Sequence, residues 1–183
     1  MIDRKKGLPV ALGILWMHAA RAQGWSMHGL AFPGHFLVRL DVGAERAVLD
    51  PFDGGARRST ADLRKILKAQ QGADAELQPA HYAPVSARDV LLRLQNNVKI
   101  RLIKDHKPDK AALAVEAMLM LAPDHVPLWR DLGMLHAHTG NLRVAISALE
   151  TFLARAAEPR PEISATSRRE AEAMLQELRR RLN

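Results

Sequence analysis

The chain has 183 residues, of which 48% are apolar and 26% are charged. This balance excludes a disordered chain, and the longest apolar run, residues 8–17, is shorter than the roughly 20 residues that a bilayer span requires. The absence of cysteine excludes disulfides and thiolate metal sites, and it fits a reducing cytoplasm. A net charge of +7 indicates an anionic partner, although an aromatic content of 4% argues against single-stranded nucleic acid.

The first 22 residues imitate a secretory signal, because a basic start precedes the apolar run 8–17 and a small-residue triplet at 20–22. Trp16, His18 and Arg21 interrupt the apolar character and favour an amphipathic helix inside the fold. Pro9 suits the first turn of that helix, where its missing N–H has no intrahelical partner. Gly24 is expected to end the helix.

Three short strands are predicted next, at residues 27–32, 35–40 and 47–49, with a hairpin turn at 41–45. Residues 50–55 form a turn-rich loop with one proline and two glycines. Ser59 and Asp62 match a capping box that opens a short helix ending near Gln70. These elements predict a small antiparallel sheet packed on one helix.

From Ser86 onward the chain reads as helical. Ser86 and Asp89 form a second capping-box pattern. Further helices are expected at residues 111–121, 127–138 and 141–156, and a last one from Ser167 to Leu182 with a capping box completed by Glu170.

Two of these helical hairpins are related by a repeat. Ala111 and Ala145 are 34 positions apart, as are Val115 and Leu149. This period resembles the tetratricopeptide repeat. The first copy departs from the motif at Gln95, where tryptophan is expected, and two copies need a cap to be stable.

Three ordered motifs, followed by this repeat tail, resemble the bacterial SirB-type family, whose first part belongs to the transglutaminase-like superfamily. The motifs are KKGLPVAL at 5–12, FPGHFLVR at 32–39 and DPFDGG at 50–55. The resemblance implies an α+β fold with a truncated transglutaminase-like (papain-like) domain at 1–71, consisting of a helix plus a small antiparallel sheet. A linker at 72–85 then leads to an all-α tetratricopeptide-like domain with a C-terminal capping helix at 86–183. Family members usually carry a helical region before the first motif, so we expect an apolar face that a partner or a second copy would bury.

In the superfamily's thiol enzymes a cysteine opens the core helix and works with a histidine and an aspartate. Matching Gly24 to the glycine that ends this helix puts Pro9 on the cysteine position and leaves His35 and Asp50 on the other two. Proline offers no nucleophile and no proton, so a covalent thiol mechanism cannot proceed there. We expect a remnant His35–Asp50 pair, which either ties the structure together or binds and polarises a ligand.

Resemblance to tetratricopeptide proteins implies that the first helix of each hairpin lines a concave groove. The residues expected to face it are Arg93, Asn96 and Lys104 in the first copy, with Arg130 and His138 in the second. They suit a carboxylate or an acidic peptide, and the alternative is that they are ordinary solvated positions. No metal site is predicted, because His136 and His138 face different directions on a helix and no nearby carboxylates complete a ligand set.

These observations predict a non-catalytic, cytoplasmic protein-interaction module without a cofactor. One alternative is a hydrolase or acyltransferase that uses His35 and Asp50 with water or a non-cysteine nucleophile. Another is a basic nucleic-acid-binding protein, whose affinity would fall steeply with salt.

Overall fold

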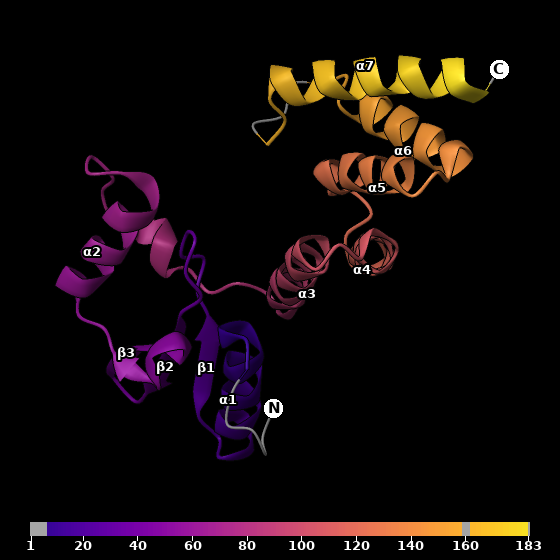
Figure 1. Cartoon of the computed structure of the whole chain (residues 1–183). Helices are drawn as coiled ribbons and strands as arrows, with labels where there is room; N and C mark the ends of the chain where they lie inside the picture. Colours follow the sequence, from indigo (N-terminus) through magenta and orange to yellow (C-terminus); the bar gives the residue numbers. More distant parts are fainter. Residues whose placement is uncertain (1–6, 159–161, 183) are drawn as a thin grey trace. The chain divides into compact units, whose positions relative to one another are not determined.

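The computed structural model describes residues 7–158 and 162–182, and the chain divides into two compact units, residues 1–91 and 92–183. The first unit contains a four-stranded sheet and the second is all-helical (Figure 1), which confirms the predicted α+β fold class. The first unit contains α1 (Pro9–Ala22), β1 (Ser26–Gly29), β2 (Val38–Val42), β3 (Glu45–Asp50), η1 (Pro51–Asp53), β4 (Ala56–Arg57), α2 (Thr60–Gln71) and η2 (Pro79–Tyr82). The helices that follow are α3 (Ala87–Lys104), whose first residues belong to the first unit, α4 (Pro108–Leu121), α5 (Val126–His138), α6 (Leu142–Arg155) and α7 (Ala165–Leu182). Among the described residues, no helix combines the length and apolar character needed to cross a bilayer.

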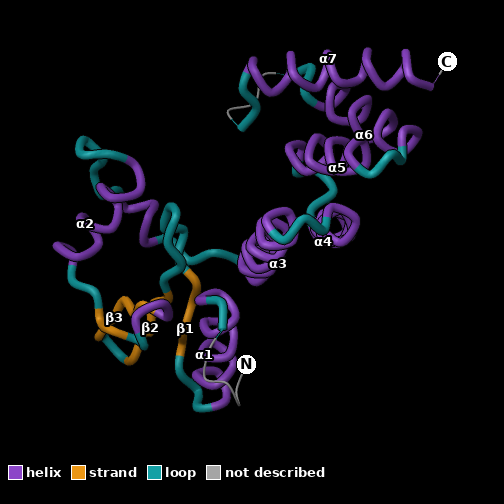
Figure 2. The backbone as a smooth tube through the Cα atoms, in the orientation of Figure 1, coloured by secondary structure: helices purple, strands orange, loops and turns teal. Residues whose placement is uncertain are grey.

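Helix α1 begins and ends where the sequence predicts. Pro9 is its first residue, and the chain leaves the helix through Gly24, whose φ of 72° is one that glycine adopts without strain. The helix lies along β1 (Figure 2). Gly13 allows it to approach the sheet closely, because a β-carbon at this position would come within 2.4 Å of the Phe36 ring.

The sheet has the strand order β1-β2-β3-β4, and all its neighbours are antiparallel. The hairpin between β2 and β3 is tighter than predicted: Val42 pairs with Glu45, and Gly43 at φ 59° turns the chain in two residues. The prediction that His35 begins a strand is wrong, because β2 begins at Val38 and His35 lies in the loop before it. Pro33 and Gly34 cause this difference, because proline cannot donate to the ladder and Gly34 has a φ of 67°.

The core of the first unit joins the loop before β2 to helix α2. Its buried members are Leu30, Phe32, Leu37, Leu63 and Leu67. Residues 72–85, the predicted linker, contribute Ala75, Leu77 and Tyr82 to the edge of this core. The backbone of the same stretch bonds to the end of β1, since the Val85 N–H donates to the Gly29 carbonyl at 2.9 Å.

In the second unit, α4 packs on α5, α5 on α6 and α6 on α7 (Figure 2). The repeat is visible in the burial of equivalent positions, because Ala111, Val115, Ala145 and Leu149 are each 0% exposed. Trp129 packs against two apolar clusters, one formed mainly by α4 and α5 and the other mainly by α6 and α7. Its indole N–H donates to the Pro123 carbonyl at 3.1 Å.

The first hairpin, α3 with α4, and the second, α5 with α6, differ at one equivalent position. In the second hairpin Gly133 lets α5 and α6 approach, since a β-carbon there would come within 2.6 Å of Leu149. The residue one repeat earlier is Lys99, whose ammonium bonds the Asp131 carboxylate of α5 at 2.5 Å. A long cationic side chain therefore replaces a close helix contact in the first hairpin.

Helix α7 begins two residues earlier than predicted. The Ser164 hydroxyl, rather than that of Ser167, caps it by accepting from the Ser167 N–H at 3.0 Å. Glu170, which was predicted to complete a capping box, instead forms an ion pair with Arg130 of α5.

We expect Gly133→Ala to lower the free energy of unfolding by about 1–2 kcal/mol, because overpacking against Leu149 outweighs the gain of up to about 1 kcal/mol in helix propensity. Urea unfolding followed by circular dichroism measures this change. In a Leu149→Ala background the same substitution should cost nothing. An equal cost in both backgrounds would show that the close approach of α5 and α6 does not depend on the missing side chain.

Candidate functional site

Asp50 is the centre of the candidate site. It is the last residue of β3 and the N-cap of η1, and it is 1% exposed. Its Oδ1 accepts a hydrogen bond from the Phe52 N–H at 2.9 Å, which sets the direction of the turn that follows the strand. A buried carboxylate is stable in such a position only when partners occupy its oxygens.

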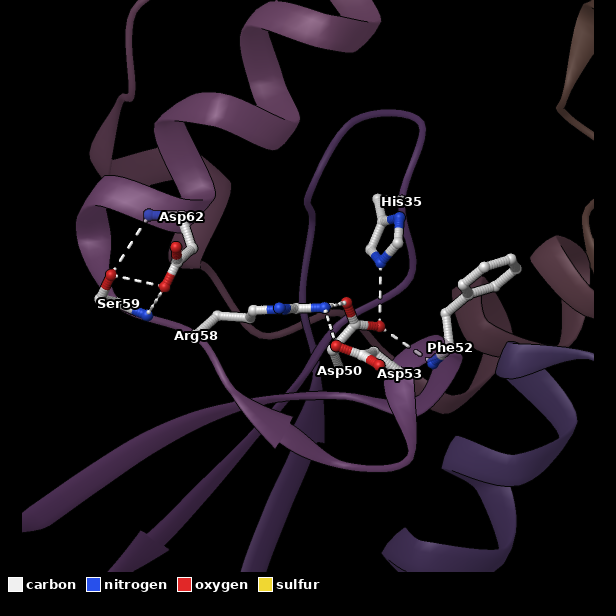
Figure 3. Close-up of polar contacts among 7 residues, drawn as sticks. All are labelled: His35, Asp50, Phe52, Asp53, Arg58, Ser59 and Asp62. Carbon is white, nitrogen blue, oxygen red and sulfur yellow. Dashed lines mark hydrogen bonds and ion pairs between the residues drawn. The ribbon is translucent and has the colours of Figure 1, made fainter.

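His35 supplies one partner, as predicted. Its Nε2 lies 2.9 Å from Asp50 Oδ1 (Figure 3). The Phe52 ring meets the imidazole edge to face, with 5.9 Å between ring centroids. Because an ionised carboxylate only accepts hydrogen bonds, Nε2 carries the proton toward Asp50. In the neutral ring Nδ1 is therefore the atom left to accept a proton.

Arg58 supplies the other partner and was not predicted. Its Nε and Nη2 donate to Asp50 Oδ2 at 3.0 and 2.8 Å, and Nη2 also donates to Asp53 Oδ2 at 2.8 Å. Figure 3 shows the guanidinium reaching one oxygen of Asp50 while His35 reaches the other. Gly54 and Gly55 turn the chain so that β4 pairs back on β3 and delivers Arg58 to this place. The sequence offered one signal for this role of Arg58. It is a basic residue that follows shortly after Asp53 and the two glycines of the turn.

These contacts decide the charge of Asp50. Burial by itself would raise the pKa of the carboxyl, but the hydrogen bonds from His35, Arg58 and the Phe52 N–H together hold the pKa of Asp50 below its usual value. The same pairing raises the pKa of Arg58. Asp50 and Arg58 are therefore both charged at neutral pH.

A hollow of about 480 Å³ opens beside this network. Its lining includes His35, Asp50, Phe52, Arg58 and Lys65. The His35 side chain is 20% exposed, so its ring reaches the hollow while Asp50 stays covered. Chemically, such an imidazole can accept a proton from a bound hydroxyl, thiol or water.

Helix α1 packs next to the same network. It contacts η1, its Gly13 faces Phe36, and its Trp16 lies against Gly55. Pro9 is the residue with which this helix begins. Of the hydroxyls near in sequence, Ser59 is committed to capping α2 through Asp62, and Ser26 bonds His28 at 2.9 Å.

The predicted groove residues lie in different environments. Lys104 and His138 are exposed and Asn96 is half-buried. Arg130 forms the ion pair with Glu170, and burial lowers the pKa of Arg93. Within residues 7–158 and 162–182, no group of three or more His, Asp or Glu side chains is close enough to hold a metal ion.

We expect Asp50→Asn to lower the free energy of unfolding at pH 7 by about 2–4 kcal/mol, because it leaves Arg58 and His35 without a buried charge partner. A carboxyl with a depressed pKa stabilises the fold above its unfolded-state pKa, so the wild type should lose this contribution as the pH falls below about 4. Urea unfolding from pH 7 to pH 3, followed by tryptophan fluorescence, measures both effects.

Asp53→Asn is the matched control, because Asp53 bonds the same arginine but its side chain is 62% exposed. It should cost no more than about 1 kcal/mol. Equal losses in the two variants would contradict a central role for the buried carboxylate.

Both halves of the chain match known protein families. A sequence profile of the transglutaminase-like superfamily matches residues 1–96, and one of the tetratricopeptide repeat matches residues 98–176. A UPF0162 protein of Xylella fastidiosa is 30% identical over 156 residues, which are 84% of this chain and 56% of that protein. A UPF0162 protein of Vibrio cholerae is 29% identical over 154 residues, 84% of this chain and 57% of that protein.

A eukaryotic protein, F-box only protein 21 of Mus musculus, is 28% identical over 151 residues, which are 76% of this chain and 23% of that protein. The chain thus spans little more than half the length of the bacterial relatives named above. With its helix, sheet and His35–Asp50 pair followed by repeats, this chain belongs to the transglutaminase-like superfamily and, within it, to the SirB-type family of UPF0162 proteins.

Proposed function

We propose that this protein is a non-catalytic transglutaminase-like domain joined to a tetratricopeptide-like domain that binds another protein in the cytoplasm. The observation that carries the proposal is Pro9 as the first residue of helix α1, in a chain without cysteine. The site keeps the histidine and the aspartate that would serve a thiol, but it has no thiol to serve.

The structure supports a structural role for the remaining pair. Asp50 Oδ1 is bonded by His35 and the Phe52 N–H, and Oδ2 is bonded by Arg58. The network connects the loop before β2, η1 and the residue after β4, so it stabilises the fold with or without turnover.

Partner binding is assigned to the helical repeats, since tetratricopeptide domains generally bind proteins. Lys104 and His138 are the groove residues with exposed side chains, and Asn96 adds an amide. This set suits an acidic peptide. Arg130 contributes indirectly, because its ion pair with Glu170 ties α7 to α5.

A second candidate function follows from the hollow beside His35. Its volume of about 480 Å³ is large enough for a small substrate, and the exposed edge of the imidazole could activate water there. In that case His35→Ala would abolish turnover on a panel of amides and esters while the fold is kept. No turnover by the wild type on the panel would leave the interaction function as the better explanation.

We expect Pro9→Cys to create a reactive thiol, because Pro9 is at a helix N-terminus and matches the cysteine position. The pKa of this thiol should fall below about 7.5, compared with about 8.5 for a free cysteine. The rate of alkylation by iodoacetamide as a function of pH measures it without interference, since the chain has no other cysteine.

Two further variants make this measurement specific. Thr60→Cys places a thiol at the first residue of α2, so it reports the effect of a helix N-terminus without the imidazole. Adding His35→Ala to Pro9→Cys should raise the pKa by at least about one unit. If the thiol at position 9 matches that at position 60 and ignores His35, then Pro9 does not occupy the nucleophile position.

We expect Lys104→Glu with His138→Glu to abolish capture of a specific partner in a crosslinking pull-down from the native cell, after nuclease treatment. Lys110→Glu with His125→Glu is the matched control, because it changes the same residue types at exposed positions outside the proposed groove. Loss of the partner in both double variants would indicate a general charge effect, and retention in both would reject the groove.

A further inference from the structure

A second cavity in the first unit is separate in its lining from the His35 site. It has a volume of about 300 Å³ and is lined by α1, β1 and the stretch from Val85 to Leu91. Its wall is mainly apolar, with Met17 from α1, Met27 from β1 and Val90 from the start of α3. This size is at the lower end of the range for small-molecule sites, so a ligand here must be small.

Gly29 shapes the base of the cavity. A β-carbon at this position would come within 3.0 Å of Val90 and 3.1 Å of Val85. The glycine thus lets β1 approach the opposite wall, and a side chain in its place would press on that wall. Val90 of the opposite wall is itself buried, with 4% of its surface exposed.

The ionisable side chains that line the cavity carry one sign of charge. They are Arg21, His18 and His28, and the lining contains no Asp or Glu. An arginine can hold a carboxylate through two parallel hydrogen bonds, and imidazoles can donate one each. An apolar cavity with only basic groups is complementary to a molecule with an apolar body and an anionic end.

The guanidinium of Arg21 differs from those of Arg39 and Arg58 in its partners. Arg39 is occupied by Asp41 and the Tyr82 carbonyl, and Arg58 by Asp50 and Asp53. Among the described residues, none forms a hydrogen bond or an ion pair with the guanidinium of Arg21, which is exposed. Its guanidinium therefore keeps its full donor capacity for a ligand.

We infer that this cavity binds a small amphipathic carboxylate, with its hydrocarbon chain against Met17, Met27 and Val90 and its carboxylate on Arg21. The inference does not depend on the loss of the thiol or on the groove of the repeats. Two consequences follow from the chemistry. Affinity should rise about fourfold for each methylene until the cavity is full, and a neutral or cationic head group should bind more weakly.

The test uses the full chain with ¹³C-labelled methionine methyl groups, titrated with octanoate below its micelle concentration. The methyl signals of Met17 and Met27 should shift and saturate. Met120 is the internal control, because it lies in the second unit and is 86% exposed. Hexanoate should bind about sixteenfold more weakly than octanoate, since it lacks two methylenes, and octanol and octylamine should also be weaker.

Arg21→Ala should weaken octanoate binding by about tenfold or more, as expected for the loss of a charge-assisted pair. Arg46→Ala is the control, because it removes an exposed arginine of β3 in the same unit. An amide proton–nitrogen spectrum of each variant establishes that its fold is intact.

Several outcomes would overturn the inference. Equal binding of octanoate and octanol would show that the basic residues select nothing. An unchanged affinity in Arg21→Ala would assign that arginine to the end of helix α1 alone. A shift of Met120 together with Met17 would indicate detergent-like adsorption. Concentration-dependent shifts of Met17 and Met27 without ligand would show that a second copy covers the cavity.

Discussion

The first unit depends on one buried negative charge. Asp50 is 1% exposed, and a carboxylate removed from water is costly unless hydrogen bonds replace its hydration. Here His35 and the Phe52 N–H satisfy one oxygen, and the Arg58 guanidinium satisfies the other. The donors come from the loop before β2, the turn after β3 and the residue after β4. A single side chain thus bonds three segments and adds to the pairing of β4 with β3.

This arrangement explains how the site geometry forms in a chain without cysteine. Each bond to Asp50 contributes to folding, and none of them involves Pro9. The histidine is held in one orientation by the carboxylate, and its partner Phe52 limits the tilt of the ring. A catalytic frame whose parts stabilise one another does not require the reaction in order to form.

Local chemistry was predictable from the sequence, whereas pairing between distant residues was not. The capping boxes at Ser59 and Ser86 depend on residues three apart, and both are formed. The His35–Asp50 pair was recognised through family motifs. Arg58 was missed because its role depends on how Gly54 and Gly55 fold the chain back onto β3, which no residue pattern states. Arg130 was assigned to a groove because the sequence cannot show that Glu170, forty positions later, lies beside it.

The exchange of Gly133 for Lys99 between the two repeats has a consequence for how the second unit responds to its surroundings. The second hairpin is joined by direct contact of α5 with α6, which salt does not affect. The first hairpin is joined to α5 by the apolar packing of α4 and also by the Lys99 ammonium of α3 and the Asp131 carboxylate of α5, whose side chains are 11% and 32% exposed. Dissolved ions weaken such a pair to a limited degree, and they leave the apolar contact untouched. Ionic strength therefore acts on the link between α3 and α5, as it does on the more exposed Arg130–Glu170 pair between α5 and α7, and it leaves the contact of α5 with α6 in place.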